Sequence, residues 1–360
     1  MAQSPQHMSD SASAFSAPNS FTEPLFEQLK RHPKRIVFSD ADDDRILRVA
    51  EKMVELGIGI PILVGNREAI RARADELGTK MELVRVIQPD LASDFPLFCE
   101  RLERIERYRG IKDIDAKSIL SDPDYFAAMM VQYGHADACL SGNVSTPAGV
   151  FRPLLHLIAP NADVPRVFAV TTLVSDQLAH FGRDGKLFLS DCGLVADPTV
   201  EELASIAVET GKLAHHYLGR RVRVALLSHS TMGTSNTAPA LKVQAATALA
   251  REKADPLEIE IDGEIQADVA LDAAAAEVKL PSQERKAPAD VLVFPSLDAA
   301  HISLKLLQHV GGAQNYGQLI CGLTRPAAQV PRTASEETIL GTAAALGVEA
   351  IKFHELYPRG

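Results

Sequence analysis

The chain has 360 residues, 46% of them hydrophobic, and a formal net charge of −10. This length is enough for one large domain or two ordinary domains with a complete hydrophobic core, so neither a metal ion nor a disulfide is needed for folding. An acidic chain without basic patches among aromatic residues is not typical of nucleic-acid-binding proteins, although a small anionic ligand needs only a local cation and a helix terminus.

The cysteines and the apolar segments indicate the compartment. Cys99, Cys139, Cys192 and Cys321 are scattered without a Cys-x-x-Cys pair, which predicts free thiols in a reducing environment. No apolar run reaches membrane-spanning length, and the N-terminus lacks a signal-peptide pattern. We therefore expect a cytoplasmic protein that has neither a membrane nor a nucleic acid as a partner.

The first third of the chain predicts a disordered leader followed by a parallel sheet. Residues 1–20 are rich in Ser, Ala, Gln and Pro without periodicity, as in disordered segments. An amphipathic helix over residues 21–31 follows. The pattern then predicts strands over 35–41, 60–65 and 84–88, with helices over 45–56 and 67–77 between them. Such a βαβαβ run is typical of a parallel sheet.

A short apolar strand over residues 136–140 leads through a small polar loop into a helix. Ser145 or Thr146 can cap this helix, and Pro147 suits its first turn. The first amides of a helix have no intrahelical partner, so a strand, a polar loop and a helix N-terminus in succession often bind anions.

The side chains around this loop support an anion site without proving one. Gly142 lets the backbone approach a ligand closely, Ser141, Asn143 and Thr146 are hydrogen-bond donors, and Arg152 follows on the face of Ser145. An ordinary βα turn with a surface arginine explains the local pattern equally well. The rest of the chain must decide between the two.

Helices and strands continue to alternate to the C-terminus. We expect further strands over residues 166–174, 186–195, 222–228, 257–261, 290–294 and 318–322. Further helices are expected over residues 90–110, 122–133, 199–217, 239–253, 298–310 and 333–346. This alternation predicts an α/β fold of one or two doubly wound units.

Polar clusters follow five of the predicted strands, where open α/β sheets bind ligands. They span residues 141–146, 190–192, 228–237, 262–268 and 296–301. Arg332 precedes the last helix, where Thr333 and Glu336 have the spacing of a capping box. Each cluster alone is an ordinary set of turn residues. Five together, with Arg152 and Arg332 as cations, indicate a cleft for a phosphorylated ligand.

Other kinds of site find little support in the sequence. The chain has no P-loop, dinucleotide-binding or nucleophile-elbow motif. His215 and His216 diverge on consecutive helix positions, so we expect no metal site. His229 and His301 lie in polar loops and are more typical of rim residues than of catalytic ones. Nothing adjacent to Cys192 lowers its pKa, so a buried structural thiol is the simpler interpretation.

The order of motifs resembles the phosphate acetyl/butyryl transferase family from about residue 35 onward. The matching stretches are ADACLSGNVSTPAGVFRP, FLSDCGLVADPT, ALLSHSTMGT, IDGEIQAD, VFPSLDAAHIS and residues 322–339. The resemblance implies a homodimer of chains with two doubly wound, three-layer domains and an interdomain cleft. It places residues 21–160 plus 319–360 in the first domain and residues 161–318 in the second. It also implies acyl transfer between coenzyme A and inorganic phosphate, with the thioester as substrate and no cofactor.

The chain departs from the family pattern near the chemistry. Arg332 matches the arginine of the usual Ser-Arg-Gly motif, but Pro331 and Thr333 replace its neighbours. Thr338 stands where the family has an aspartate thought to take the coenzyme A proton, and Glu106 stands where it has an arginine. Asp298 and His301 replace amides. At these positions the sequence resembles the transacetylase-like, ligand-sensing domain that is fused to some malic enzymes.

Two hypotheses from different classes follow. In the first, the chain is a phosphate acyltransferase, most simply an acetyltransferase, in which Arg152, Arg332 and the amides near Gly142 hold phosphate. The hydroxyls of Ser228, Ser230 and Thr231 then orient the phosphate or the acyl group, and Glu337 replaces the missing base only if its helix shifts. In the second, the chain is a catalytically weak module that binds acetyl-CoA or acetyl phosphate as a sensor.

Overall fold

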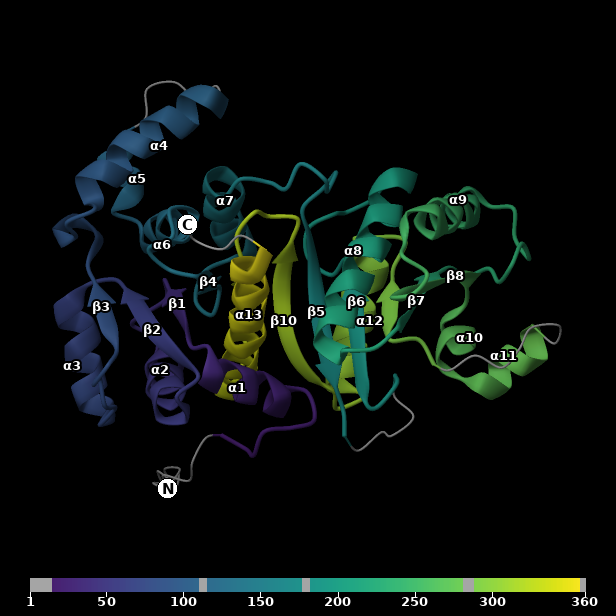
Figure 1. The fold of residues 1–360 in the computed structure, drawn as a ribbon, viewed down its shortest axis with the longest axis horizontal. Coiled ribbons are helices and arrows are strands. Elements are labelled where there is room, and N and C mark those ends of the chain that lie inside the picture. Colours follow the sequence, from purple (N-terminus) through teal and green to yellow (C-terminus); the bar gives the residue numbers. More distant parts are fainter. Residues whose placement is uncertain (1–14, 110–114, 177–181, 281–287, 357–360) are drawn as a thin grey trace, which may run out of the picture.

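The computed structural model describes residues 15–109, 115–176, 182–280 and 288–356, which form an α/β fold around one sheet (Figure 1). The sheet order within these residues is β3-β2-β1-β4-β11-β10-β5-β6-β9-β7-β8. The strands are β1 (Lys34–Phe38), β2 (Gly59–Val64), β3 (Arg85–Ile87), β4 (Ala138–Ser141), β5 (Phe168–Val174), β6 (Lys186–Ser190), β7 (Val222–Leu227), β8 (Ile259–Ile265), β9 (Val291–Val293), β10 (Gln314–Cys321) and β11 (Ala327–Gln329).

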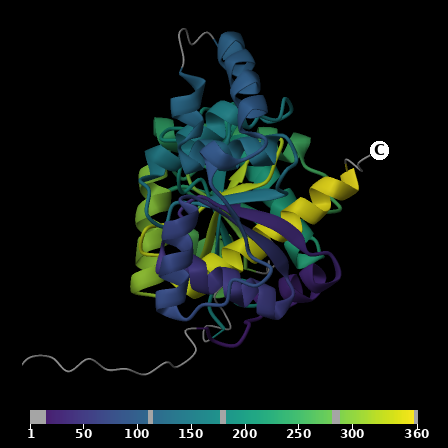
Figure 2. The same ribbon diagram turned by 90° about the vertical axis from the view of Figure 1, so that its left-hand side faces the viewer.

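Helices cover both faces of this sheet (Figure 2). They are α1 (Thr22–Arg31), α2 (Asp44–Leu56), α3 (Arg67–Leu77), α4 (Phe95–Arg109), α5 (Ala116–Leu120), α6 (Pro123–Gln132), α7 (Pro147–Leu157), α8 (Val200–Leu218), α9 (Ala238–Lys253), α10 (Ala267–Leu271), α11 (Ala273–Lys279), α12 (Leu297–His309) and α13 (Glu336–Leu356), with a 3-10 turn η1 (Pro89–Leu91).

Local capping residues fix the ends of the early helices where the sequence predicts them. The Asp43 carboxylate accepts a hydrogen bond from the Arg45 amide, and Gly57 ends α2 at φ 67°. Thr199 and Glu202 form a reciprocal capping box at the start of α8, and Gly219 ends that helix at φ 62°. An N-cap needs a side-chain acceptor, and these C-caps need a left-handed backbone. Both needs restrict the residue type, so the sequence alone predicts these helix ends.

The last helix differs from the prediction at both ends. It begins at Glu336 rather than near Thr333 and continues to Leu356. Ser335 Oγ, not Thr333, accepts the hydrogen bond from the Thr338 amide at 3.2 Å. Glu336 instead pairs with Arg48 at 2.9 Å. The predicted capping box is therefore wrong, because a tertiary ion pair uses the glutamate and the next serine takes over the cap.

The sheet consists of two parallel groups that run in opposite directions. Strands β1–β4 and β11 are parallel to one another, and so are β6, β9, β7 and β8. Between them, β10 is antiparallel to both β11 and β5, and β5 is antiparallel to β6. The α/β class is confirmed, but the sheet is mixed and continuous. The boundary between two domains within it stays a prediction.

The hydrophobic core is continuous on one face of the sheet and divided on the other. Ile36 and Phe38 pack on one face, in a cluster that reaches from α1, α2 and α3 through α13 to α8 and α9. Val37 points to the opposite face, as strand alternation requires, and packs with α4 to α7. On that same face a separate cluster joins α10 and α12 to Leu173 and Leu187.

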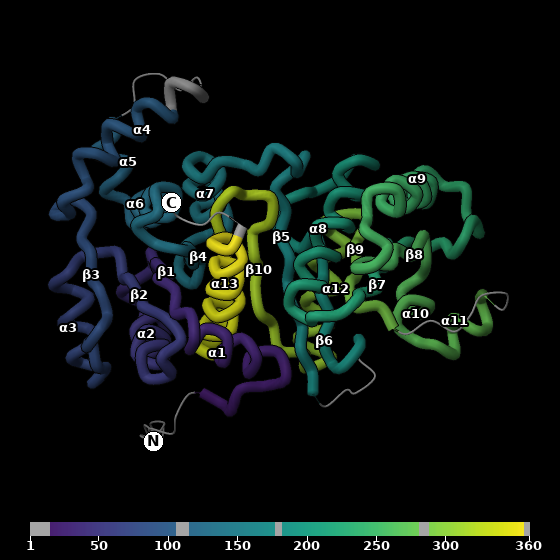
Figure 3. Tube along the Cα trace, viewed as in Figure 1, coloured from purple at the N-terminus to yellow at the C-terminus, as the bar shows by residue number. Residues whose placement is uncertain are grey.

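The C-terminal helix lies beside elements from the start of the chain. Figure 3 shows α13 next to α1 and β10, and α13 also packs on α2, β1, β4 and β11. Its small residues allow this close approach. A Cβ atom on Gly341 would lie 2.2 Å from Cε1 of Tyr316. The C-terminal segment thus returns to the first half of the sheet.

Residues 15–20 take part in the fold, although the sequence predicted them as part of a disordered leader. The Ser16 amide donates to Glu337 Oε1 at 2.7 Å, and Asn19 Nδ2 donates to the Tyr316 hydroxyl at 2.6 Å. Phe15 packs against the main core. Residues 1–14 lie outside the described residues.

Replacing Gly341 by alanine should destabilise the fold. The added methyl group meets the buried ring of Tyr316, and overpacking of this kind costs about 1–3 kcal/mol. Chemical denaturation measures the loss. Gly347→Ala on the same helix is the matched control, because its Cβ would approach closely only the methyl ends of Leu29, which can rotate, and would make an ordinary contact with Ile36 Cδ1 at 3.6 Å. Equal stabilities of the Gly341→Ala variant and the parent would show that Tyr316 is not fixed in place.

Candidate active site

The loop from β4 to α7 has the predicted shape. Thr146 caps α7, since its hydroxyl accepts from the Gly149 amide at 3.3 Å, and Pro147 is the first helical residue. Arg152 is exposed on this helix and makes no hydrogen bond or ion pair with any described residue. The helix N-terminus and a cation without a protein partner therefore belong to one element.

Gly142 is required where the loop meets β11. Its φ is 110°, and a Cβ atom there would lie 2.6 Å from the Val330 carbonyl oxygen. Its amide donates to Asp40 Oδ2 at 2.8 Å, and the Val144 amide lies 3.4 Å from the same oxygen. These amides, which the sequence assigned to phosphate, are thus already bonded to a carboxylate at the end of β1. An external anion would need the Asp40 side chain to move before it could use them.

Ser141 and Asn143 are both buried but differ in their partners. Ser141 Oγ lies 2.6 Å from Ser39 Oγ, so its hydroxyl is used inside the fold. The side-chain oxygen and nitrogen of Asn143 form no hydrogen bond with a described residue. The amide still lies close enough to Asp43 to help lower the pKa of that carboxyl, where hydrogen bonds from Arg45 outweigh the opposing effect of burial. Asn143 is the loop residue with unused hydrogen-bonding capacity.

Asp124 at the start of α6 faces the same loop. Ser39 Oγ donates to its Oδ1 at 2.5 Å, and Ser145 Oγ lies 3.3 Å from its Oδ2. Ser145 Oγ also lies 3.2 Å from Asp40 Oδ1, so one hydroxyl bridges two carboxyl groups. Burial raises the pKa of Asp124, and the negative charge of Asp40 adds to this effect.

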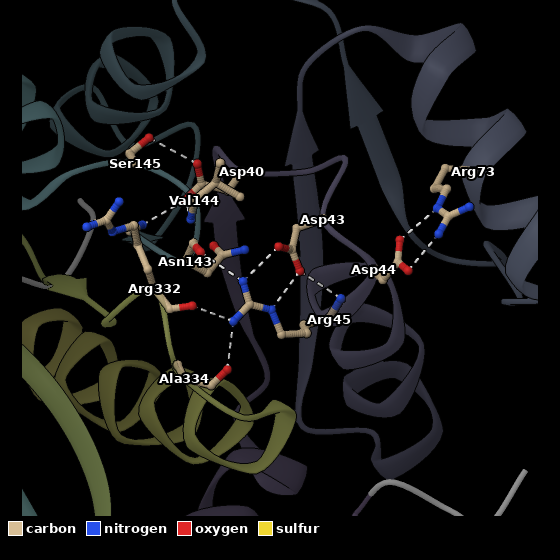
Figure 4. A network of polar contacts seen from close by, with 11 residues as sticks. Asp40, Asp43, Asp44, Arg45, Arg73, Asn143, Val144, Ser145, Arg332 and Ala334 are labelled. Atoms are coloured by element: carbon tan, nitrogen blue, oxygen red, sulfur yellow. Dashed lines mark hydrogen bonds and ion pairs between the residues drawn. The ribbon is translucent and has the colours of Figure 1, made fainter. Parts of the chain in front are cut away.

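Arg45 connects this loop to the segment before α13 (Figure 4). Its guanidinium donates to the carbonyls of Arg332 at 2.9 Å, Ala334 at 2.8 Å and Asn143 at 2.8 Å. Its pair with Asp43 raises the pKa of Arg45 further above its ordinary value. Sequence reasoning read the Asp-Asp-Asp-Arg stretch after the first strand as a helix start only. The signal available in the sequence was that Arg45 follows the first predicted strand within a few residues, as the polar clusters follow the other predicted strands.

Arg332 is exposed, and Figure 4 shows its guanidinium pointing toward Asp40 and Val144. Its carbonyl is held by Arg45, so the backbone position is fixed while the side chain is available to a ligand. The structure therefore places Arg332 beside the β4–α7 loop. Whether Arg152 and Arg332 contact one anion stays a prediction.

The two residues considered for base catalysis at α13 have structural partners. The Thr338 hydroxyl is buried and lies 3.2 Å from Ser335 Oγ. The Glu337 carboxylate accepts from the Ser16 amide at 2.7 Å and from Gln314 Nε2 at 2.8 Å. Glu337 is therefore tied to the N-terminal segment and β10. Glu106 belongs to α4, but its side chain lies outside the described residues.

The hydroxyls after β7 are used within their own loop. Ser228 Oγ accepts from the Ser230 amide at 3.2 Å, and Ser230 Oγ donates to Glu264 Oε1 at 2.8 Å. Thr231 Oγ1 accepts from the Gln266 amide at 3.1 Å. Ser230 and Thr231 are buried. These three residues shape the loop, and a contact with substrate stays a prediction for each of them.

The clusters after β6 and β9 meet each other. The Asp191 carboxylate accepts from backbone amides including those of Gly193 at 2.8 Å and Val195 at 2.6 Å, so it stabilises its own loop. Gln318 Nε2 donates to the Cys192 carbonyl at 3.0 Å, and His301 Nδ1 lies 3.4 Å from the same oxygen.

The remaining groups of these two clusters differ in exposure. Asp298 is exposed in the first turn of α12. Burial raises the pKa of the Cys192 thiol, as expected for an inert structural cysteine.

The predicted residues thus fall into two groups. Ser141, Gly142, Asn143, Thr146 and Arg332 lie together, with Arg152 further along α7. Ser228, Ser230, Thr231, Asp298 and His301 follow strands that run antiparallel to β4, and no hydrogen bond between described residues joins the two groups. The rule that carboxyl ends of parallel strands share one edge applies to each half separately, because β5 and β10 reverse the direction.

The described residues contain neither a metal-binding cluster nor a membrane-spanning helix. No group of three or more His, Cys, Asp or Glu side chains is placed to hold a metal ion. In the same part of the chain, no helix is both long enough and apolar enough to span a membrane.

Comparisons with known proteins agree with this fold. The family described as Phosphate acetyl/butaryl transferase matches residues 20–346. A phosphate acetyltransferase from Acetivibrio thermocellus is 33% identical over 335 residues, covering 92% of this chain and 98% of that protein.

Two solved structures are similar over the same extent. EutD phosphotransacetylase from Staphylococcus aureus has a TM-score of 0.81, and a phosphotransacetylase from Streptococcus pyogenes has a TM-score of 0.83. Each is 29% identical, and each match covers 92% of this chain and 98% of the other. The resemblance seen in the sequence motifs is confirmed. The chain belongs to the phosphate acetyl/butaryl transferase family.

Proposed function

We propose that the chain is a working phosphate acetyltransferase, which converts acetyl-CoA and phosphate into acetyl phosphate and coenzyme A. One observation carries the proposal. The Arg332 guanidinium points toward Asp40 and toward Val144 in the loop before α7, where the buried Asn143 amide makes no hydrogen bond with a described residue (Figure 4). A cation, a helix dipole and an unused amide form a site for a phosphoryl group.

The reaction needs mainly positioning and charge. A phosphate oxygen attacks the thioester carbonyl, the C–S bond breaks, and the coenzyme A sulfur leaves. Arg332 binds the attacking anion and offsets the negative charge of Asp40 nearby. Arg152 supplies a second cation from α7. Holding both reactants in line provides most of the acceleration, because little covalent chemistry is required of the protein.

The second half of the sheet supplies the proposed coenzyme A side. On one face of the sheet, the clusters that contain α7 and α12 are separate, and we propose that the substrates bind between them. Ser228, Asp298 and His301 are the residues we assign to contacts with the acyl group or coenzyme A from this half. We also propose a homodimer, for which sedimentation as a monomer at micromolar concentration would be contrary evidence.

The decisive experiment measures thiol release from acetyl-, propionyl- and butyryl-CoA with and without phosphate. We expect phosphate-dependent release with the highest kcat/KM for acetyl-CoA. Preference for butyryl-CoA would contradict the acetyl assignment alone. If no acyl chain is transferred while calorimetry still detects acetyl-CoA binding, the chain is the sensing module instead.

A further inference from the structure

Acetyl transfer also moves one proton. When the coenzyme A thiol attacks acetyl phosphate, a C–S bond forms, the C–O bond to phosphate breaks, and the thiol proton ends on the departing phosphate. Thr338 has no carboxylate to carry this proton. Glu337 is bonded to Ser16 and Gln314. The proton therefore needs another carrier within the site.

Ser145 has an arrangement suited to this task. Its Oγ lies 3.2 Å from Asp40 Oδ1 and 3.3 Å from Asp124 Oδ2. A hydroxyl has one proton, so it can donate to only one of two carboxylates at a time, while its lone pairs accept from a protonated neighbour. Ser145 is half-buried and directly precedes the α7 cap. It can exchange a proton with a substrate on one side and a carboxyl on the other.

We propose that Ser145 and Asp124 form the proton path of the transfer. The Ser145 hydroxyl takes the thiol proton as its own proton passes to Asp124, and the same path returns the proton to the departing phosphate. The reverse reaction uses the steps in the opposite order, so no external acid or base is consumed. Ser145 meets the substrate, and Asp124 acts through it. This inference rests on the proposed function.

Two further observations support a ligand site beside Ser145 and Asp124. Asn143, on the same loop, is buried, and its amide oxygen and nitrogen make no hydrogen bond with a described residue, although the amide lies close enough to Asp43 to affect the pKa of that carboxyl. Arg332 points toward Asp40 without an ion pair of its own in the described part of the chain (Figure 4). An unused amide and an unused cation next to the carboxyl pair are what an incoming phosphoryl group requires.

The groups facing Asp124 determine its behaviour with pH. Ser39, directly after β1, bonds to it, while Asp40, next in the chain, and Asp122 of its own helix add negative charge. On β4, Ser141 offers a hydroxyl, and the buried thiol of Cys139 has its pKa raised, mainly by its own burial. Burial of Asp124 is the largest cause of its raised pKa. Because the ionised form accepts the proton, the rate of thiol attack should rise as pH rises through this pKa.

The test compares Asp124→Asn with the parent in the direction of thiol attack. At about pH 7 we expect kcat to fall by roughly 10²- to 10⁴-fold, the usual contribution of a positioned base, with little change in KM. The acid limb of the parent profile should disappear. Activity should then recover only toward the thiol pKa of about 8.5. Ser145→Ala should lower kcat similarly without removing a charge.

Asp122→Asn is the matched control. It removes the same charge from the N-cap of the same helix, and asparagine caps equally well. We expect the parent's kcat on the plateau for this variant, with the acid limb kept but shifted to lower pH, because the charge of Asp122 no longer helps to raise the pKa of Asp124. If Asp124→Asn also behaves like the parent, the proposal is overturned.

A second measurement does not depend on turnover. Infrared titration should show one carboxyl fewer that protonates at higher pH than exposed aspartates in Asp124→Asn than in the parent, because burial also raises the pKa values of Asp191 and Glu349, which remain in both. If the parent lacks this carboxyl signal, the proposed Ser145–Asp124 proton path is overturned. If the parent shows this carboxyl signal but transfers no acyl group, the proposed function is contradicted, whereas the raised pKa of Asp124 on which the Ser145–Asp124 path depends is supported.

Discussion

Arg332→Ala should lower kcat/KM for phosphate by about 10²- to 10³-fold, the usual loss when a charged donor at a developing anion is removed. The reason is geometric. The guanidinium points toward Asp40 and toward Val144 of the loop before α7, and the Arg332 carbonyl is held separately by Arg45 at 2.9 Å (Figure 4). Truncation therefore removes the charge but leaves the loop in place. Arg332→Lys keeps the charge without the planar fork and should recover only part of the loss.

Arg221→Ala is the control for a general effect of charge. Arg221 is 53% exposed and lies 3.7 Å from Glu260 on the other half of the sheet. Its loss should leave kinetics and melting temperature unchanged. Arg152→Ala tests whether Arg152 binds the same phosphate as Arg332. If it does, the KM for phosphate should rise in this variant. Phosphate binding is measured directly by calorimetric titration. If both the Arg332→Ala and Arg152→Ala variants bind phosphate as the parent does, the proposed anion site is contradicted.

Thr338→Asp combined with Pro331→Ser should restore transfer in the Asp124→Asn background by about tenfold or more at about pH 7, as part of what a positioned base supplies. Position 338 suits a carboxylate. It is in the first turn of α13, where the dipole favours negative charge, and its amide already donates to Ser335 Oγ. The serine at 331 returns a hydroxyl and releases the fixed proline backbone before Arg332.

The pH dependence separates a restored base from a general gain. The increase should shrink at about pH 9, where the thiol ionises unaided. The same double change in the parent should produce a smaller gain, since the Ser145–Asp124 path already operates. Thr338→Asn with Pro331→Ser is the matched control without a carboxylate. Equal gains from the aspartate and asparagine variants would mean that the proline, not the missing base, limits the rate.

Local signals in the sequence predicted most of the fold. Helix α3 begins after Asn66 and ends at Gly78, as its residue types require. The three-residue strand β11 was missed because so short a segment has no periodicity. The reversed direction of β5 and β10 was also missed, since strand direction depends on partners that lie far away in the sequence.

The candidate site was predictable where one segment forms it. The β4–α7 loop and its Thr146 cap lie within a few residues of each other, and the motif identifies them. Asp40 and Asp124 were missed because they reach the loop from other strands and helices. Asp40 is 102 residues before Gly142, whose amide it accepts. The hydroxyls of Ser230 and Thr231 were assigned to substrate because a sequence cannot show that Glu264 and Gln266 already bond them.

The unequal core has a mechanical consequence. On one face, α13 and α8 join both halves through continuous packing, with Tyr217 Oη donating to the Ala345 carbonyl at 2.9 Å. On the other face the packing is interrupted between α7 and α12. Close-packed interiors resist compression, so if the two halves form separate domains, as predicted, we expect them to rotate about an axis near the continuously packed face. Under the proposed function, we expect such a rotation to widen the interrupted face and the substrates to enter from that side.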